Sequence, residues 1–424
     1  MKVMIIGSGG REHALAHFLA KSEKVSQVIC VPGSPGISEE PKCRSLELPS
    51  YEAMAVHAAK EEMDLVVIGP EGPLVEGLAD RFREAGLLVF GPGKKEAELE
   101  GSKKFSKAFM TEYGVATAGY HCFENIREAR AHVAEVGGPM VIKASGLCQG
   151  KGVWVCEGPQ EALTALKDLM EDHIFQEAGS TVIIEEYLTG PEVSILALYD
   201  GKDIHPMVSA MDHKRIGEGN TGANTGGMGS IAPAPYYTDE VRQDFMMNIL
   251  KPSLKGLKDQ NFQDPACIFF GLMLTEDGVK LLEYNMRFGD PETQSVLTLL
   301  ESDLFEVLHK GATGNLNPED LKFSKDTALC IIGAAPGYPG PFNKGIELTF
   351  PEVSGVKVFY AGIKKENGRF LSSGGRIFGA TAKGKPKETK ELLHRYMEHF
   401  GDEIIWRRDI GTIALEEQLR SDVD

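Results

Sequence analysis

The chain lacks the features of an exported, membrane-spanning or nucleic-acid-binding protein. Its seven cysteines include no Cys-x-x-Cys pair, which argues against a zinc site and a disulfide framework. No apolar run approaches the length of a transmembrane helix, and the first apolar stretch ends at Gly7, too early for a signal peptide. A net charge of −17 argues against non-specific binding to nucleic acid or membrane surfaces. We therefore expect a cytoplasmic protein with neither partner.

The composition is that of a soluble protein with several domains. At 424 residues the chain is long enough for two to four of them. Hydrophobic residues make up 42% and charged residues 25%, which is ordinary for globular proteins. The 48 glycines exceed the usual share and indicate many tight loops of the kind that approach ligands closely.

Residues 1–101 alternate strands and helices, which predicts a doubly wound domain around a parallel sheet. The expected elements are strands over 3–6, 28–31, 64–68 and 87–90, a helix opening at Arg11, and helices over 51–60 and 75–85. The glycine loop 7–10 predicts an anion site, because free N–H groups and the helix dipole point at it. Glu12 stands where a dinucleotide fingerprint needs glycine, so a phosphate or small substrate is favoured.

The next helix, predicted over 102–112, begins with Lys103 and Lys104. Their charge opposes the helix dipole, which favours an anionic ligand nearby or, equally, solvated lysines. Residues 120–188 then predict an α+β unit in which strands over 139–143 and 153–156 flank a glycine-lysine loop. A helix over 159–171 and a strand over 181–187 complete it. Such a loop can fold over a polyphosphate, and it is not a Walker loop because a strand follows it.

Two polar segments follow this unit. The carboxylates from Glu185 to Glu192, around the start of a strand over 193–199, suit the amino group of adenine and the hydroxyls of ribose. Residues 217–229 form a long polar stretch with six glycines, which is typical of a functional or disordered loop and favours substrate wrapping. A helix over 239–257 and a hairpin from a strand over 267–274 lead to the next element.

The stretch 280–294 carries the chemistry. Alternation on a strand places Leu282, Tyr284, Met286 and Phe288 in the core and turns Glu283, Asn285 and Arg287 to the other face. A carboxylate and an amide oxygen suit Mg²⁺ bridging nucleotide phosphates, and the guanidinium suits phosphate or carboxylate oxygens. A surface strand with one wet face is the alternative.

A turn from Phe288 to Glu292 is expected to open a helix over 292–309, with Asp290 as its N-cap and also a candidate ligand. Residues 326–424 predict a β-rich cap with one helix, over 388–400. Its strands are expected over 329–333, 356–363, 369–372 and 376–383. Gly374-Gly375-Arg376 reads as a turn without an assigned role.

Taken together, these segments resemble the ATP-grasp superfamily and, within it, the phosphoribosylamine-glycine ligases, also called glycinamide ribonucleotide synthetases. The resemblance is carried, in order and over nearly the whole chain, by residues 9–14, 69–71, 101–103, 212–215, 224–229, 287–294 and 333–340. It implies an N-terminal doubly wound domain over 1–101, an ATP-grasp domain over 102–325 with a mobile flap subdomain at about 120–188, and a C-terminal β-rich domain over 326–424.

The resemblance also implies the site. Glu283 and Asn285 would hold Mg²⁺ or Mn²⁺. ATP would be bound by Lys103, Lys143, Gly146, Gly150, Lys151, Gly152, Glu185, Glu186, Leu188 and Glu192. Glycine and phosphoribosylamine would be held by Gly9, Gly10, Arg11, Glu12, His13, Glu71, Asp212, Lys214, Arg215, Asn224, Gly226, Gly227, Arg287 and Asp290. The catalytic residues would be Arg287, Lys143 and Asp290.

The implied reaction joins glycine to phosphoribosylamine through glycyl phosphate, with ATP giving ADP and phosphate, in purine biosynthesis. A monomer or weak homodimer is expected. Another ATP-grasp ligase with a different acid or amine, and a non-catalytic nucleotide-binding protein, are the alternatives. Ile268 to Thr275 lack the acidic metal ligand that other ATP-grasp enzymes carry on this strand, so water or another group must complete the shell. Cys148 in the flap is expected to be sensitive to oxidation.

Overall fold

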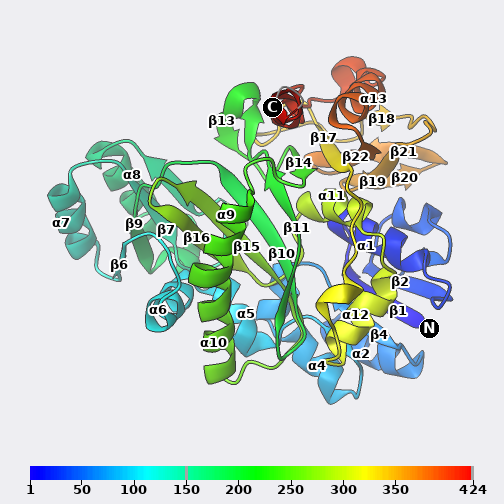
Figure 1. Cartoon of the computed structure of the whole chain (residues 1–424), viewed down its shortest axis with the longest axis horizontal. Coiled ribbons are helices and arrows are strands. Elements are labelled where there is room, and N and C mark those ends of the chain that lie inside the picture. The colour runs from blue at the N-terminus through cyan, green and yellow to red at the C-terminus, as the bar shows by residue number, and fades with distance from the viewer. Residues whose placement is uncertain (149–150, 422–424) are drawn as a thin grey trace.

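Residues 1–148 and 151–421 are described in the computed structural model, and the expected multidomain α/β architecture is confirmed (Figure 1). The N-terminal sheet is parallel and has the order β3-β2-β1-β4-β5. Its strands are β1 (Lys2–Gly7), β2 (Gln27–Pro32), β3 (Cys43–Ser45), β4 (Leu65–Ile68) and β5 (Val89–Phe90). Its helices are α1 (Gly10–Ala20), α2 (Tyr51–Lys60), α3 (Glu71–Val75) and α4 (Leu78–Glu84).

Strand β1 has apolar side chains on both of its faces, and helices cover both. Val3 and Ile5 pack with α1, whereas Met4 and Ile6 pack with α2 and α4. A strand buried on both sides needs the continuous apolar run seen in the sequence. The single helix expected over 75–85 is wrong, because Gly77 takes a left-handed conformation (φ +83°) and separates α3 from α4.

The flap lies at one end of the molecule (Figure 1). Its sheet has the order β6-β9-β7-β8. The strands are β6 (Tyr120–Phe123), β7 (Met140–Ala144), β8 (Val153–Cys156) and β9 (Val182–Glu186), and the helices are α7 (Ile126–Val136) and α8 (Pro159–Met170). Val133, Ile142 and Leu166 are fully buried in its own small core. Helices α5 (Lys94–Gly101) and α6 (Lys103–Tyr113) join it to the N-terminal sheet.

The largest sheet has eight strands in the order β16-β15-β10-β11-β14-β17-β22-β19. They are β10 (Glu192–Tyr199), β11 (Ile204–Asp212), β14 (Gly229–Ala232), β15 (Ala266–Thr275), β16 (Gly278–Asn285), β17 (Thr327–Ala334), β19 (Lys357–Tyr360) and β22 (Arg376–Gly384). Strand β14 pairs with β17, so the sheet runs without a break from the central region into residues 326–424.

The helix expected over 239–257 is confirmed as one continuous helix, in which a π-helical turn, Met246–Leu250, joins α9 (Asp239–Phe245) to α10 (Lys251–Asp259). The helix expected over 292–309 is divided into α11 (Glu292–Leu299) and α12 (Leu304–Ala312). Asp303 caps α12 by accepting the Phe305 N–H at 2.9 Å, which starts a new helix.

The polar stretch 217–229 is not a featureless loop. It contains most of an exposed hairpin, β12 (Arg215–Gly217) with β13 (Thr221–Asn224), before β14 begins. The C-terminal region adds a three-stranded sheet of β18 (Glu347–Leu348), β20 (Ile363–Glu366) and β21 (Arg369–Ser372).

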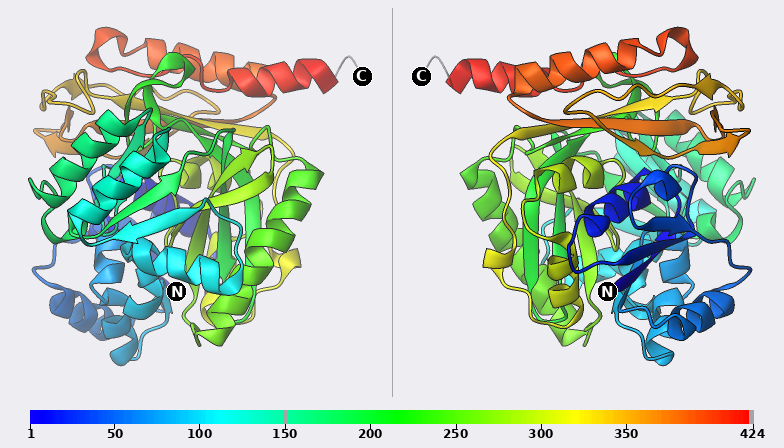
Figure 2. Two further views of the ribbon diagram at one scale, coloured as in Figure 1. Left: turned by 90° about the vertical axis from the view of Figure 1, so that its left-hand side faces the viewer. Right: turned by 90° about the vertical axis from the view of Figure 1, so that its right-hand side faces the viewer.

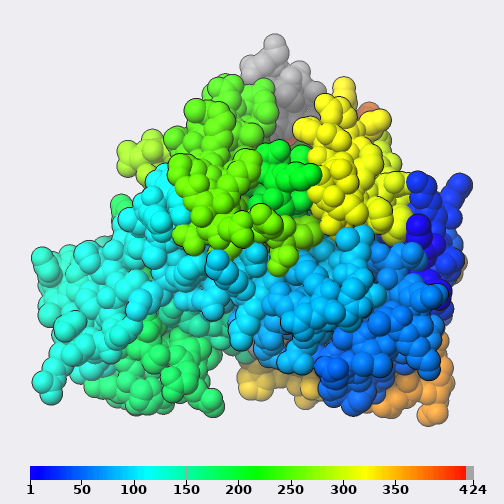
Figure 3. All heavy atoms as spheres, turned by 90° about the horizontal axis from the view of Figure 1, so that it is seen from below, coloured from blue at the N-terminus to red at the C-terminus, as the bar shows by residue number. Residues whose placement is uncertain are grey.

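The C-terminal region has two helices rather than one, α13 (Pro386–Glu398) and α14 (Thr412–Ser421). Both lie outside the orange strands of this region (Figure 2). Leu393, Tyr396 and Met397 of α13 pack into the largest core. Seen from below, the N-terminal residues, in blue and light blue, adjoin the cyan-to-teal segment that contains the flap (Figure 3). None of the described helices is long and apolar enough to cross a membrane.

Candidate active site

Strand β16 carries the candidate metal ligands, but its alternation is broken. Gly271 pairs with Glu283, whereas Leu272 pairs with Leu281, so Leu282 is the extra residue of a β-bulge. The core residues are therefore Val279, Leu281 and Tyr284. The expectation that Leu282 lies in the core is wrong, because the bulge shifts the alternation. Its carbonyl instead faces Lys143 Nζ at 3.5 Å.

Glu283 and Asn285 follow this bulge. Burial works to raise the pKa of Glu283, but the charges of Lys103, Lys143, Lys214 and Arg287 outweigh it and lower that pKa. Asn285 Oδ1 accepts a hydrogen bond from Arg287 Nη2 at 3.1 Å. A deprotonated carboxylate and an amide oxygen therefore stand on one short segment. Among the described residues no group of three or more His, Cys, Asp or Glu side chains could hold a metal by itself.

Arg287 lies beside acidic side chains from two helices of the N-terminal half, Glu71 on α3 and Glu100 on α5. Its Nε lies 3.1 Å from Glu100 Oε1 and 3.7 Å from Glu71 Oε2. Glu100 Oε2 also accepts the Met286 N–H at 2.7 Å, which ties α5 to the end of β16. Burial raises the pKa of Glu100 even though the charge of Arg287 opposes it. The guanidinium thus faces three acidic or amide groups in a nearly closed environment.

The lysines form a second cluster around Glu185, which is 3% exposed. Lys143 Nζ lies 2.8 Å from Glu185 Oε2, and Lys107 Nζ lies 3.2 Å from Oε1. Lys107 is 2% exposed and also donates to Thr117 Oγ1 at 2.7 Å. Burial lowers the pKa of Lys107 to about 8. Two buried cations on one carboxylate leave positive charge available for an anionic ligand.

Lys103 and Lys104 have separate environments. The backbone N–H of Lys103 donates to Ser145 O at 2.8 Å, so the start of α6 lies against the flap loop. Lys104 is exposed and pairs with Glu124 at 2.5 Å. The anionic ligand predicted from the charge of these lysines is therefore expected near Lys103, whereas Lys104 is a solvated lysine.

The N-terminal glycine loop is hydrogen-bonded by a side chain of α1, the helix that follows it. Glu12 Oε2 accepts the Gly9 N–H at 2.6 Å, and its Oε1 lies 2.5 Å from Arg11 Nε. Arg11 Nη1 donates to Phe288 O at 3.0 Å, which joins α1 to the turn after β16. The His13 ring is fully buried between Glu40 and the Tyr360 backbone N–H. His13 thus connects the N-terminal and C-terminal regions.

Asp290 does not cap a helix, because α11 begins after Pro291. Its Oδ2 lies 2.9 Å from Arg376 Nη2, and its Oδ1 accepts from Gln294 Nε2 at 2.8 Å. A Cβ placed on Gly9 would lie 3.7 Å from Asp290 Oδ2. The carboxylate therefore stands between the first glycine loop and the C-terminal region. The capping role expected from the sequence is wrong.

Asp212 and Glu292 form an acidic pair nearby. Burial, together with the charge of Glu292, raises the pKa of Asp212 well above its usual range. Asp212 Oδ1 is buried without a hydrogen-bond partner among the described residues. Lys214 pairs with Glu192. The backbone of Thr225 donates to Lys214 O at 2.8 Å, which anchors the loop that follows.

The remaining predicted residues lie farther out or in the flap. Arg215 bonds Gly222 O at 2.8 Å within the exposed hairpin, where Asn224 is also exposed. Glu186, Leu188 and Lys151 lie at least partly in solvent. Gly146 donates to Ala178 O at 3.0 Å and Gly152 O accepts from Ala144. Gly150 lies outside the described residues.

Cys148 does not fit the expected oxidation-sensitive thiol. Its side chain packs in the flap core, the residue is 8% exposed, and burial raises its pKa. A buried, protonated thiol is a poor nucleophile.

Three residues of the site were not predicted from the sequence. They are Glu100, Lys107 and Arg376. Lys107 had a detectable signal, because it follows Lys103 by four residues on a predicted helix and so shares its face. Arg376 follows a glycine pair that marks a turn, and Glu100 shows no signal beyond its charge.

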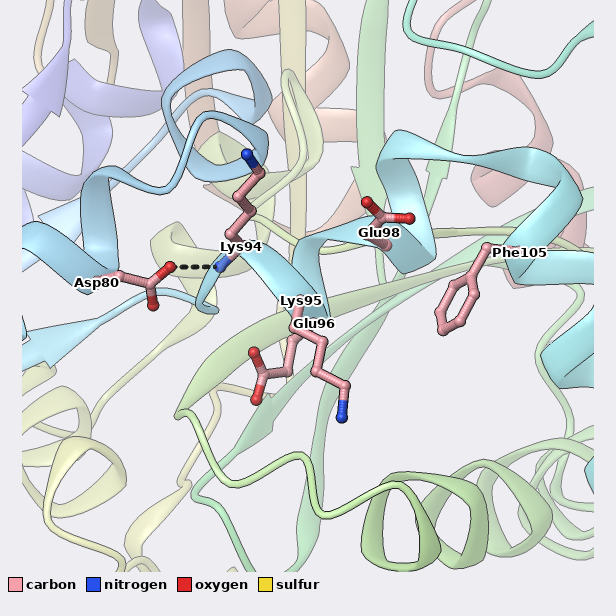
Figure 4. A pocket seen from close by; sticks show the side chains of 6 residues that line it. All are labelled: Asp80, Lys94, Lys95, Glu96, Glu98 and Phe105. Carbon is pink, nitrogen blue, oxygen red and sulfur yellow. Dashed lines mark hydrogen bonds between the residues drawn. The ribbon is translucent and has the colours of Figure 1, made fainter.

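A separate hollow lies beside α5 and is drawn in Figure 4. Its lining residues are Asp80, Lys94, Lys95, Glu96, Glu98 and Phe105. The Lys94 N–H donates to Asp80 Oδ2 at 2.9 Å. Because two lysines and three carboxylates share this hollow, it does not favour one charge of ligand.

The match of residues 101–293 to a family model for an ATP-grasp (A) domain places the protein in the ATP-grasp class. Solved biotin carboxylases share the fold at low identity. The biotin carboxylase domain of 2-oxoglutarate carboxylase from Hydrogenobacter thermophilus, solved with MgADP and bicarbonate, is 18% identical with a TM-score of 0.72 over 94% of this chain and 89% of its own.

The family follows from three matching family models. The N, ATP-grasp (A) and C domains of phosphoribosylglycinamide synthetase match residues 1–100, 101–293 and 328–413. The chain belongs to the phosphoribosylglycinamide synthetase family, as the resemblance predicted.

Relatives agree over nearly the full length. Phosphoribosylamine–glycine ligase of Clostridium acetobutylicum is 46% identical over 97% of this chain and 99% of its own. The enzyme of the same name from Fusobacterium nucleatum is 42% identical over the same shares. The crystal structure of the Thermotoga maritima phosphoribosylamine–glycine ligase has a TM-score of 0.84 at 31% identity, covering 96% of this chain and all of that one.

Proposed function

We propose that this protein is a cytoplasmic phosphoribosylamine–glycine ligase of purine biosynthesis. It joins glycine to phosphoribosylamine at the expense of ATP, giving glycinamide ribonucleotide, ADP and phosphate. Membership of the family supports the reaction class. The observation that carries the proposal is the meeting of two charge clusters, the lysines around Glu185 and the carboxylates around Arg287, on either side of Glu283 and Asn285.

The residues present fit a magnesium ion shared with the substrate. Glu283, kept deprotonated by four neighbouring cations, and the amide oxygen of Asn285 would hold it. One carboxylate and one amide are too few for a closed protein cage but suit Mg²⁺, which keeps water and phosphate oxygens as further ligands. Bound there, the metal would neutralise charge on the phosphates. Mn²⁺ offers the same coordination, which metal replacement would test.

The lysines would bind the phosphates of ATP. Lys143 is held by Glu185 in this structure, and Lys107 holds the other oxygen of the same carboxylate. Lys143 can therefore turn to a phosphate while Glu185 keeps a buried partner. Lys103, next to the flap loop, supplies a further cation. The flap with Gly146, Gly150, Lys151 and Gly152 would cover the polyphosphate, and Glu185, Glu186, Leu188 and Glu192 would surround adenine and ribose.

The chemical steps need positioned charge rather than a protein nucleophile. A carboxylate oxygen of glycine attacks the γ-phosphorus of ATP, and the bond to ADP breaks, which leaves glycyl phosphate. The amine of phosphoribosylamine then attacks the acyl carbon, phosphate leaves, and the nitrogen loses a proton. Arg287 faces the transferring group, and Lys143 offsets its charge. Closure of the flap would exclude water from glycyl phosphate.

The non-nucleotide substrates would lie between the first glycine loop and the turn at Asp290. Their proposed contacts come from the loop Gly9–His13, Glu71, Asp212, Lys214, Arg215, Asn224, Gly226, Gly227, Arg287 and Asp290. For the domains we propose boundaries after residues 101 and 325, with a flap over about 120–188. In solution we propose a monomer or weak homodimer.

An ADP-release assay tests the proposal. The protein is given Mg-ATP with glycine and freshly made phosphoribosylamine, each omitted in turn. ADP is expected only with both, together with glycinamide ribonucleotide in equal amount. Glu283→Gln should abolish turnover, whereas Glu276→Gln, on the exposed turn before β16, should not change it. Stimulation by another amino acid but not by glycine would replace the substrate assignment.

A further inference from the structure

The C-terminal region contributes no residue to the site predicted from the sequence, yet one of its side chains lies inside that site. Arg376, at the start of β22, is 20% exposed in its side chain. Its Nη1 donates to Gly226 O, to Asp290 O at 2.9 Å and to Gly227 O at 3.3 Å. Its Nη2 donates to Asp290 Oδ2 at 2.9 Å. One guanidinium therefore joins a glycine loop of the central region to the turn after β16.

A second C-terminal residue holds the same loop from its other side. The hydroxyl of Tyr338 accepts the Gly226 N–H at 3.0 Å. Both polar groups of the Gly226 backbone are thus bonded to residues of the C-terminal region. A Cβ on Gly226 would lie only 3.1 Å from Arg376 Cζ, so the loop lies flat against the guanidinium. The arrangement uses the planar fork of an arginine, which a lysine cannot reproduce.

The bonded groups face the predicted binding residues. Gly227 lies against Asp212, because a Cβ there would come within 2.6 Å of Asp212 Oδ1. Asp290 faces Gly9 and Gly10 at the N-terminus of α1. Arg376 also offsets the charge of Asp290, which would otherwise stand uncompensated where anionic substrates are expected. The ATP-binding lysines bond a different carboxylate, Glu185.

We propose that Arg376 is a positioning residue, assisted by Tyr338, through which the C-terminal region shapes the binding site for glycine and phosphoribosylamine but not that for ATP. The proposal rests on the proposed function for the identity of the two substrates. The positioning itself rests only on the five hydrogen bonds.

Steady-state kinetics test the substrate part. Arg376→Met is expected to raise KM for glycine and for phosphoribosylamine by about tenfold to a hundredfold, the factor for a lost hydrogen bond to a charged group. KM for ATP should stay within about twofold of wild type, below the smallest loss expected for a charged contact. Arg376→Lys should recover part of the loss because it restores the charge but not the fork. Arg369→Met is the matched control, since Arg369 pairs with Glu347 on the surface of the same region.

Amide hydrogen exchange tests the positioning part without any substrate. Arg376→Met and Tyr338→Phe should each speed exchange in the peptide that contains Gly226 and leave the flap peptides unchanged. Tyr338→Phe keeps the test valid if Arg376→Met does not fold. Faster exchange with unchanged KM values, or an equal rise in KM for ATP, would overturn the proposal. Unchanged exchange would overturn the positioning alone, and a wild type without glycine-dependent turnover would overturn the proposed function instead.

Discussion

Replacing Arg287 by Met should destabilise the fold as well as stop turnover, because Arg287 is the cation beside Glu100. The two side chains are 19% and 8% exposed, and their charged atoms are 3.1 Å apart. Removing one partner of a buried pair costs about 3–5 kcal/mol, and partial exposure of Arg287 favours the lower end. An unfolding entropy of about 2.1 cal/mol/K per residue converts 3 kcal/mol into a fall of roughly 3 °C for a chain of this length.

Addition of Glu100→Gln should separate stability from function. The double variant Arg287→Met/Glu100→Gln removes the more buried of the two carboxylates that face Arg287 and leaves Glu71, which is 26% exposed, so its unfolding midpoint should return part of the way to that of wild type. Its turnover should stay absent, because the guanidinium is still missing. Thermal unfolding followed by circular dichroism and the ADP-release assay measure the two effects. An unchanged midpoint in Arg287→Met, or recovered turnover in the double variant, would refute this reasoning.

Four further predictions concern other parts of the molecule. Lys143→Met should lower kcat/KM for ATP by about a hundredfold in the ADP-release assay, whereas Lys104→Met, which loses only an exposed pair with Glu124, should not. Lys107 has its pKa lowered from 10.5 to about 8, so the unfolded chain binds the extra proton between these values. The stability that Lys107 contributes should therefore increase with pH across that window. The thermal unfolding midpoint of wild type, relative to that of Lys107→Met, should rise between about pH 7.5 and about pH 10. A difference that stays constant over this range would contradict the prediction. Cys148→Ser should lose activity in peroxide at the wild-type rate, since Cys148 is buried, while thiol labelling of the native protein should find the exposed Cys122. A chain ending at residue 325 should fail to give a cooperative unfolding transition, because β14 would lose its partner β17.

The regular elements of this protein could be predicted because their patterns are local. The apolar run of β1 and the helix α2 depend on neighbours in the sequence. Elements that depend on tertiary contacts could not. The bulge at Leu282 shifts the alternation of β16, and Gly77 and Asp303 end and restart helices that periodicity alone joins together. At each of these three positions the apolar pattern of the sequence continues, but the backbone departs from the regular strand or helix.

The candidate site divides in the same way. Glu283 and Asn285 could be predicted because a strand places them on one face, and Arg287 follows two residues after that strand ends. Glu100, the partner of Arg287, could not, because it lies more than a hundred residues earlier and is a charged residue on an ordinary helix. Lys107 pairs instead with Glu185, and its sequence signal was its place four residues after Lys103. The conclusion that Asp290 is an N-cap was reasonable from its place before Pro291, yet the side chain bonds Arg376, 86 residues away. Proximity in the fold, rather than residue type, selects these groups.

The continuity of the large sheet explains how a region without predicted ligands can reach the site. Strand β14 lies between β11, which ends at Asp212, and β17. The loop that enters β14 therefore starts at the candidate site and ends in a sheet shared with the C-terminal region. Because β22 pairs with β17, its first residue, Arg376, is held at the same end of the sheet as Gly229. A rigid sheet thus fixes the distance between Arg376 and the glycine loop, which is the requirement for positioning a substrate to within a fraction of an ångström.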